Sequence, residues 1–163
     1  MKTIRRNSVA ALIIALVCIT AGLSLAANAQ TKKPTMPFAR ETAAQQPLYS
    51  EYKSIRLGMT TQEVRAKLGT PAIKNSDQDY YVFSENETAQ IGYDDAHKVV
   101  TISVDYLGGV GAPDYKTIVG GELVISPSGA LYRIVRYDSL GFWVSYNRTT
   151  GSVPMVSITI QKT

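Results

Sequence analysis

The single histidine, His97, is the one side chain that titrates near neutral pH when it is unperturbed. Asp94 and Asp95 stand just before it, so these three residues could be drawn as a metal site. One histidine and two adjacent acids do not complete a zinc ligand set. Aspartate is also favoured in hairpin turns, where its carboxylate bonds to nearby backbone groups. We therefore expect a turn at these residues and no metal site.

Other catalytic patterns are equally weak. Ser126 and Ser128 lack the surroundings of a nucleophile elbow, and no second histidine is available as a base. The glycine pairs at 108–109 and 120–121 lack the lysine and helix start of a phosphate-binding loop. The only cysteine is Cys18, which excludes a disulfide framework. The sequence predicts no catalytic residues, no cofactor and no enzyme.

Aromatic and basic residues concentrate near the C-terminal end of the chain. If Val144 points into a core, strand alternation turns Trp143 and Ser145 outward. Tryptophan beside arginine is typical of protein-binding hot spots, and tryptophan also stacks on sugars or single-stranded bases. Alternatively, these side chains only form stabilising cross-strand pairs, or a helix or the N-terminal tail covers them. The candidate binding residues are Trp143, Arg136, Arg148 and Tyr132.

The net charge of +4 is unevenly distributed along the 163 residues. Residues 1–29 carry three bases and no acid, and residues 30–47 carry three bases and one acid. Residues 48–163 hold eleven bases and twelve acids. The part expected to fold therefore has no surplus of positive charge for a nucleic acid, so we expect no nucleic-acid partner.

The N-terminus has the three parts of a secretory signal peptide. A basic start precedes the apolar run of residues 9–25, and an Ala-x-Ala site ends at Ala29. We expect cleavage after Ala29 and export to the periplasm or cell envelope. An uncleaved membrane anchor and lipidation at Cys18 remain alternatives. Residues 30–47 hold three prolines and no apolar period, which predicts a flexible tether.

One short helix is strongly marked after the tether. Thr60 is a suitable N-cap, and Glu63 three positions later completes a capping box. Val64 and Leu68 form one apolar stripe, and Gly69 suits the position after the helix. So short a helix is unstable alone in water, so we expect it to pack on a sheet.

These residues also carry a family resemblance. Gly58-Met59-Thr60, Val64 and the run Leu68-Gly69-Thr70-Pro71 resemble the signature of the SmpA/OmlA family over about residues 54–107. The family consists of small outer-membrane lipoproteins that assist β-barrel assembly, and its fold packs short helices on an antiparallel sheet. This chain departs from the family because it has no lipidated cysteine at the expected mature N-terminus and continues for over fifty residues past the match.

Period-2 segments follow the helix in two similar series. The first is expected at 80–83, 89–93 and 99–106, and the second at 122–125, 131–137, 142–146 and 155–160. In the third segment, we expect Val100, Ile102 and Val104 to share the buried face. The second series lacks a capped helix of its own. The predicted core is Met59, Val64, Leu68, Phe83, Ile91, Tyr93, Val100, Ile102, Val104, Phe142, Val144, Val156, Ile158 and Ile160.

The predicted fold class is α+β: a short helix or helix pair packed on an antiparallel sheet, with two consecutive three-stranded meander units. Residues 48–163 form one domain, with units at about 48–107 and 113–163. The resemblance and the export signal imply a non-enzymatic envelope protein that binds another protein. The alternative is a secreted inhibitor or ligand-binding module that uses the aromatic and arginine-rich face. Oligomeric state and peripheral membrane association stay open.

Overall fold

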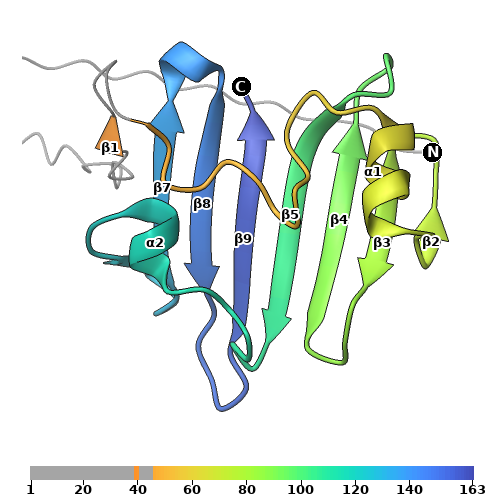
Figure 1. Cartoon of the computed structure of the whole chain (residues 1–163). Helices are drawn as coiled ribbons and strands as arrows, with labels where there is room; N and C mark the ends of the chain where they lie inside the picture. Colours follow the sequence, from red (N-terminus) through yellow and green to blue (C-terminus); the bar gives the residue numbers. More distant parts are fainter. Residues whose placement is uncertain (1–38, 41–45) are drawn as a thin grey trace, which may run out of the picture. The chain divides into compact units, whose positions relative to one another are not determined.

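The core of the fold is a single sheet whose strands are antiparallel, except for one short parallel pair at an edge. The structure is a computed structural model, and it describes residues 39–40 and 46–163. The predicted signal peptide and most of the predicted tether lie outside the described residues. The strand order is β1-β7-β8-β9-β5-β4-β3-β2, and β6 also pairs with β7. The α+β prediction is confirmed, although the sheet makes up most of the domain (Figure 1).

The long strands agree closely with the segments expected from the sequence. They are β3 (Gln78–Val82), β4 (Glu87–Tyr93), β5 (Val99–Leu107), β7 (Leu131–Tyr137), β8 (Phe142–Arg148) and β9 (Met155–Lys162). The short strands are β1 (Ala39–Arg40), β2 (Ile73–Lys74) and β6 (Val124–Ile125). A 3₁₀ helix, η1 (Asp138–Leu140), joins β7 to β8.

Two short strands were not expected. β2 pairs with β3, and β1 lies within the segment predicted as a flexible tether. There, Ala39 and Arg40 pair in parallel with Val135 and Arg136 of β7. A two-residue strand has too few residues to show alternation, so its pairing is decided by the neighbouring strand rather than by its own pattern.

The helix α1 (Thr61–Leu68) forms where its capping residues and terminal glycine predict it. The Thr60 side chain accepts a hydrogen bond from the backbone N–H of Glu63, and the Glu63 carboxylate accepts one from the backbone N–H of Thr60 at 2.7 Å. Gly69 ends the helix with a φ of 83°, a conformation that glycine adopts at little cost. No helix among the described residues is long and apolar enough to span a membrane.

A second helix, α2 (Tyr115–Val119), precedes the second series of strands, where the sequence predicted no capped helix. Asp114 is its N-cap and accepts a hydrogen bond from the backbone N–H of Lys116 at 2.7 Å. Five residues are too few for an apolar period, so only the cap could have indicated this helix. Ile118 and Val119 bury its inner side against the sheet.

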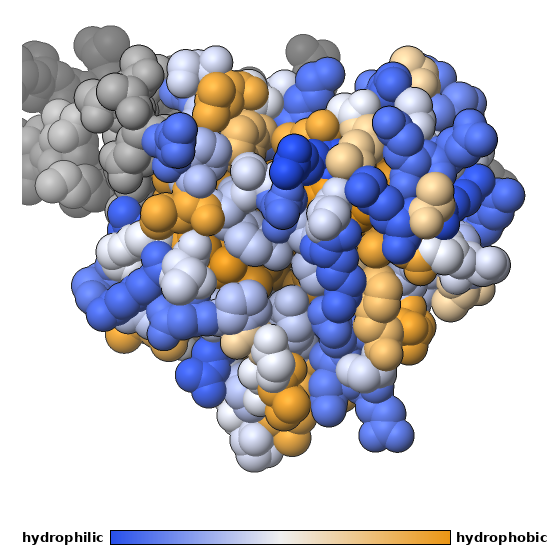
Figure 2. All heavy atoms as spheres, in the orientation of Figure 1, coloured by the Kyte–Doolittle hydropathy of each residue, from blue (hydrophilic) through white to orange (hydrophobic). Residues whose placement is uncertain are grey.

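One face of the sheet is covered, and we call it the covered face. The two helices and the segment 46–60 all lie in front of this face (Figure 1). The segment contributes Tyr52 and Ile55, and the helices contribute Val64, Ile118 and Val119, to one cluster with the inward side chains of the strands. Figure 2 shows this side of the molecule and the hydrophilic residues over α1, whose apolar side chain Val64 is turned inward.

The predicted core is largely buried, and one of its less buried members, in β5, shows a local change of register. Val99 is 1 % exposed, whereas Val100, predicted to be buried, is only half-buried. The cause is a register shift at Gly92/Tyr93, where Tyr93 pairs with Val99 and Gly92 pairs with Thr101. Val100 is therefore the extra residue of a β-bulge. The alternation of buried and exposed side chains that holds from Ile102 onward is interrupted at this residue, so Val100 does not share the face of Ile102. Met59, Leu68 and Phe83 are partly buried, and the other predicted core residues are buried.

Apart from Tyr93, which was predicted, the buried tyrosines belong to the part of the core that the sequence did not predict. Six of the ten are buried on the covered face: Tyr52, Tyr81, Tyr93, Tyr106, Tyr137 and Tyr146. Their abundance therefore mainly reflects the interior of this protein, because the rings fill the broad space between the sheet and its cover.

Candidate functional site

The sheet face opposite the helices carries the chain's only tryptophan, and we call it the open face. Val144 is 0 % exposed toward the core, so Trp143 and Ser145 point the other way, as the alternation predicts. Among residues 39–40 and 46–163, the helices and the covering segment lie on the other side of the sheet (Figure 1). The described cover therefore leaves the open face uncovered.

The structure brings together three of the four predicted binding residues. Arg136 on β7 is the direct cross-strand partner of Trp143 on β8. Tyr132 lies on the same face, four positions earlier on β7. Arg148 does not join them, because it follows Trp143 by an odd number of residues and so points to the side of Val144. Both Trp143 and Tyr132 are half-buried and Arg148 is exposed.

A band of hydroxyl and amide side chains crosses the middle of the open face. Ser145 pairs with Thr159, and the hydroxyl of Thr159 hydrogen-bonds that of Ser103 at 3.2 Å. In the next row, the hydroxyl of Ser157 donates to the carboxylate of Asp105 at 2.5 Å. Gln90 donates to Gln78 farther across the sheet. These side chains bond to one another and hold the face in one arrangement.

Apolar side chains lie at the far side of the same face. Ile73 on β2 and Val82 on β3 are 55 % and 56 % exposed. Ile73 pairs with Tyr80, which belongs to the row of Ser145, while Val82 belongs to the row of Ser157. The open face therefore has an aromatic and arginine-rich margin, a polar band and an aliphatic margin.

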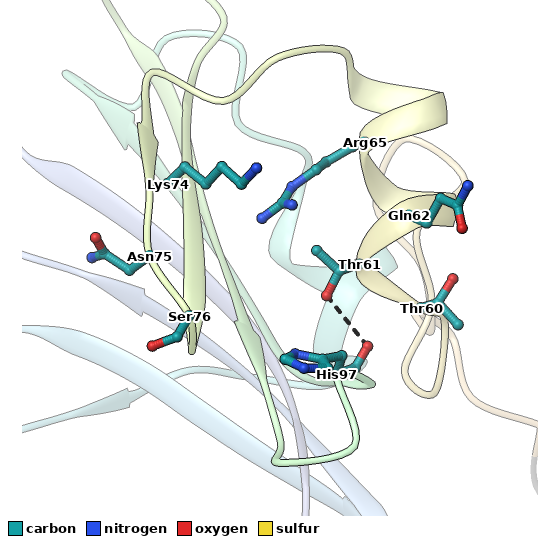
Figure 3. A pocket seen from close by; sticks show the side chains of 8 residues that line it. All are labelled: Thr60, Thr61, Gln62, Arg65, Lys74, Asn75, Ser76 and His97. Atoms are coloured by element: carbon teal, nitrogen blue, oxygen red, sulfur yellow. Dashed lines mark hydrogen bonds between the residues drawn. The ribbon is translucent and has the colours of Figure 1, made fainter.

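A second feature is a cleft of about 540 Å³ beside the start of α1 (Figure 3). The N-cap and first turns of α1 form one wall, the strand β2 and the residues after it form another, and the turn before β5 closes the end. The lining residues are Thr60, Thr61, Gln62, Arg65, Lys74, Asn75, Ser76 and His97. No acidic residue is among them.

Arg65 is held in this cleft by a buried carboxylate. Its Nε and Nη2 donate to the two carboxylate oxygens of Asp79 at 2.8 Å and 2.7 Å. The Asp79 side chain is 0 % exposed, whereas that of Arg65 is 27 % exposed. The hydroxyl of Tyr93 donates to the same carboxylate at 2.9 Å, and that of Tyr81 lies at 3.5 Å. The carboxylate is thus compensated by a charge and by neutral donors, as a buried charge requires.

This network changes the acidity of its members. The hydrogen bonds to Asp79 raise the pKa of Arg65, so the guanidinium keeps its charge. Burial, and after it the hydrogen bond to Asp79, raises the pKa of Tyr93 well above its ordinary value. Burial and then the charge of Asp79 raise the pKa of Tyr81 to about 12. Both tyrosines therefore stay neutral donors at physiological pH.

The cluster at Asp94, Asp95 and His97 forms a turn, as expected. The Asp94 carboxylate accepts hydrogen bonds from the backbone N–H groups of Ala96 and Lys98 at 3.0 Å and 2.9 Å. His97 has a φ of 55°, and its backbone carbonyl accepts a hydrogen bond from the hydroxyl of Thr61 at 3.3 Å. Among those residues, no group of three His, Cys, Asp or Glu side chains could hold a metal ion.

Sequence reasoning missed both Arg65 and Asp79 as partners. Nothing in the spacing of the twelve acids of residues 48–163 selects Asp79, and nothing in the helix pattern marks Arg65 as its partner. One signal was available. Asp79 lies two positions before Tyr81 and therefore on the same face of a strand that packs against a helix, where a charged residue is unusual. Comparison with known proteins adds no further guide, since no family model, curated protein or solved structure matches this chain.

Proposed function

We propose that this protein is an exported, non-enzymatic module of the cell envelope that binds another protein through its open face. The observation that carries the proposal is the placement of Trp143, Arg136 and Tyr132 on the side opposite the described cover. Tryptophan, tyrosine and arginine are the residues most enriched in binding hot spots. The signal-peptide pattern of residues 1–29 supports export.

The dimensions of the open face suit a folded partner. Six strands from β7 to β3, at about 4.8 Å each, give a width of about 29 Å. With strands about 20 Å long, the area is about 600 Å², which approaches the roughly 800 Å² that one partner contributes to a standard interface. The band of bonded hydroxyl and amide groups offers hydrogen bonds at fixed positions, which reduces the ordering cost of binding.

The resemblance to the SmpA/OmlA family supports a role in barrel assembly in particular. It is carried by residues of the capped helix, where Thr60 is the N-cap, Val64 is buried and Gly69 ends the helix. Two meander units, β3-β4-β5 and β7-β8-β9, would then each correspond to half of the domain, and the order of the strands in the sheet supports this organisation.

The alternative is an inhibitor or ligand-binding module that uses the same face. The feature that favours it is the position of Trp143 on the open face beside Gln161 and Arg136, since an aromatic ring flanked by polar groups also stacks on small planar ligands. The two functions differ in footprint. A small ligand would depend on Trp143 alone, whereas a folded protein would also depend on Ser145 and the aliphatic margin.

The experiment isolates the partner from the envelope with the chain 30–163, purifies it and measures its affinity for four variants. Trp143→Ala and Ser145→Arg change the open face, while Leu140→Ala and Ala66→Arg make matched changes at exposed positions of η1 and α1. We expect at least a tenfold loss of affinity for the first two variants and none for the controls. Equal affinity for all four would contradict the proposal.

Localisation is tested separately by cell fractionation. We expect the processed chain in the envelope fraction, because the apolar run and the Ala-x-Ala site form a complete export signal. Recovery of the unprocessed chain in the cytoplasm would remove the export part of the proposal and leave the open face as a binding surface of another compartment.

A further inference from the structure

The cleft beside α1 holds two cationic groups that face each other. Figure 3 shows the side chains of Arg65 and Lys74 reaching toward one another from α1 and from β2. Lys74 makes no ion pair with any described residue. Because Asp79 balances the charge of Arg65, these three groups together carry one net positive charge, which an anion in the cleft would balance.

Arg65 is already positioned to receive such an anion. Two nitrogens of the guanidinium, Nε and Nη2, donate hydrogen bonds to Asp79, so Nη1 can donate to another acceptor. Because both bonds end on a fully buried carboxylate, the guanidinium is fixed before any ligand arrives. A donor fixed in advance costs less ordering on binding, and arginine is well suited to phosphate oxygens.

The rest of the lining consists of neutral donors. Gln62, Asn75 and Ser76 are exposed at the rim of the cleft and carry amide or hydroxyl groups. The nearest acid of the helix, Glu63, is not part of the lining, because its carboxylate is bound to the backbone and hydroxyl of Thr60. The lining is therefore rich in donors and contains no acidic residue, and the Asp79 carboxylate behind Arg65 is 0 % exposed.

We propose that this cleft binds the phosphate group of a phosphomonoester, with Lys74 and Nη1 of Arg65 contacting its oxygens. The volume of about 540 Å³ is larger than a bare phosphate needs, so the group that carries the phosphate occupies the remainder. That group is either a soluble compound or the headgroup of an envelope lipid. The cleft lies apart from the open face, so this inference does not depend on the proposed function.

The test is a titration of the ¹⁵N-labelled chain 30–163 with glycerol 3-phosphate, followed by NMR. We expect saturable shifts at the amides of Gln62, Asn75 and Ser76. Lys74→Gln should weaken binding about tenfold, which corresponds to about 1.4 kcal/mol. Lys67→Gln is the matched control, because it removes the same charge from the exposed end of α1 outside the cleft. Lys74 is exposed and its side chain pairs with none of the described residues, so its replacement should leave the fold intact.

The absence of saturable shifts would overturn the inference, as would an equal loss of affinity in Lys67→Gln. A second titration identifies the source of the phosphate. Vesicles of phosphatidylcholine with and without phosphatidic acid are sedimented with the chain. Binding that requires phosphatidic acid and is lost in Lys74→Gln assigns the cleft to a lipid headgroup. Binding of glycerol 3-phosphate without vesicle binding assigns it to a soluble phosphomonoester.

Discussion

The bond between Arg65 and Asp79 should be the most sensitive polar contact of the domain, and Arg65→Gln tests it. The carboxylate of Asp79 is 0 % exposed and receives two of its hydrogen bonds from Arg65. Without the guanidinium, the hydroxyls of Tyr93 and Tyr81 are the side-chain donors among the described residues that remain to compensate a buried charge. Removing one partner of a buried ion pair typically costs about 3–5 kcal/mol.

The cost should lie at the lower end of that range. The Arg65 side chain is 27 % exposed, so water replaces part of what the variant loses. We expect a loss of about 3 kcal/mol in the free energy of unfolding. For a domain of this size, each kcal/mol lowers the melting temperature by roughly 4 °C, so Arg65→Gln should lower it by about 12 °C.

A double-mutant cycle gives the sharper result. Asp79→Asn in the Arg65→Gln background removes the uncompensated charge, so the double variant should be more stable than the sum of the single losses by about 2 kcal/mol. Urea unfolding followed by circular dichroism measures all four proteins. Lys67→Gln, an exposed charge on the same helix, should change stability by less than about 0.5 kcal/mol. A loss below about 1 kcal/mol in Arg65→Gln, or additive losses in the double variant, would refute the role of this pair.

Three further predictions concern the fold itself. Burial raises the pKa of Tyr81 and Tyr106 to about 12, so these tyrosines lose their protons at a lower pH in the unfolded chain than in the folded one. The free energy of unfolding should therefore fall as the pH rises from about 10 to 12. An increase in tyrosinate absorbance over this range without any unfolding would contradict this prediction. Thr60→Ala removes the N-cap and should cost about 1 kcal/mol in urea unfolding, whereas an unchanged midpoint would mean that the cap is not needed. Val99→Thr should destabilise the domain by more than 1 kcal/mol and Val100→Thr by much less, because only Val99 is fully buried; the reverse order would show that the bulge is misplaced.

Much of the fold follows from local patterns that the sequence displays. The capping box at Thr60 and Glu63 depends on residues three positions apart, and β7 begins and ends where alternation and turn residues indicate. The side of the sheet to which Trp143 points follows from the burial of Val144 in the same way. These features are decided within a few residues of the chain.

The missed features depend on contacts between distant segments. The bulge at Val100 arises from pairing with Gly92, and the burial of Asp79 depends on where α1 places Arg65. The cleft combines α1, β2 and the turn at His97, so no single stretch of sequence contains its pattern. The prediction that groups Arg148 with Trp143 is wrong, because closeness in sequence does not give two residues a shared face and the strand alternation separates these two.

The central claim, that the open face is the binding surface, is tested most directly by photo-crosslinking in cells. A photoreactive phenylalanine derivative replaces Ser145, at the middle of the open face, or Ala66, at an exposed position of α1 on the covered side. We expect one adduct of constant mass from position 145 and none from position 66. An adduct of that mass from position 66 alone, or none from position 145, would contradict it.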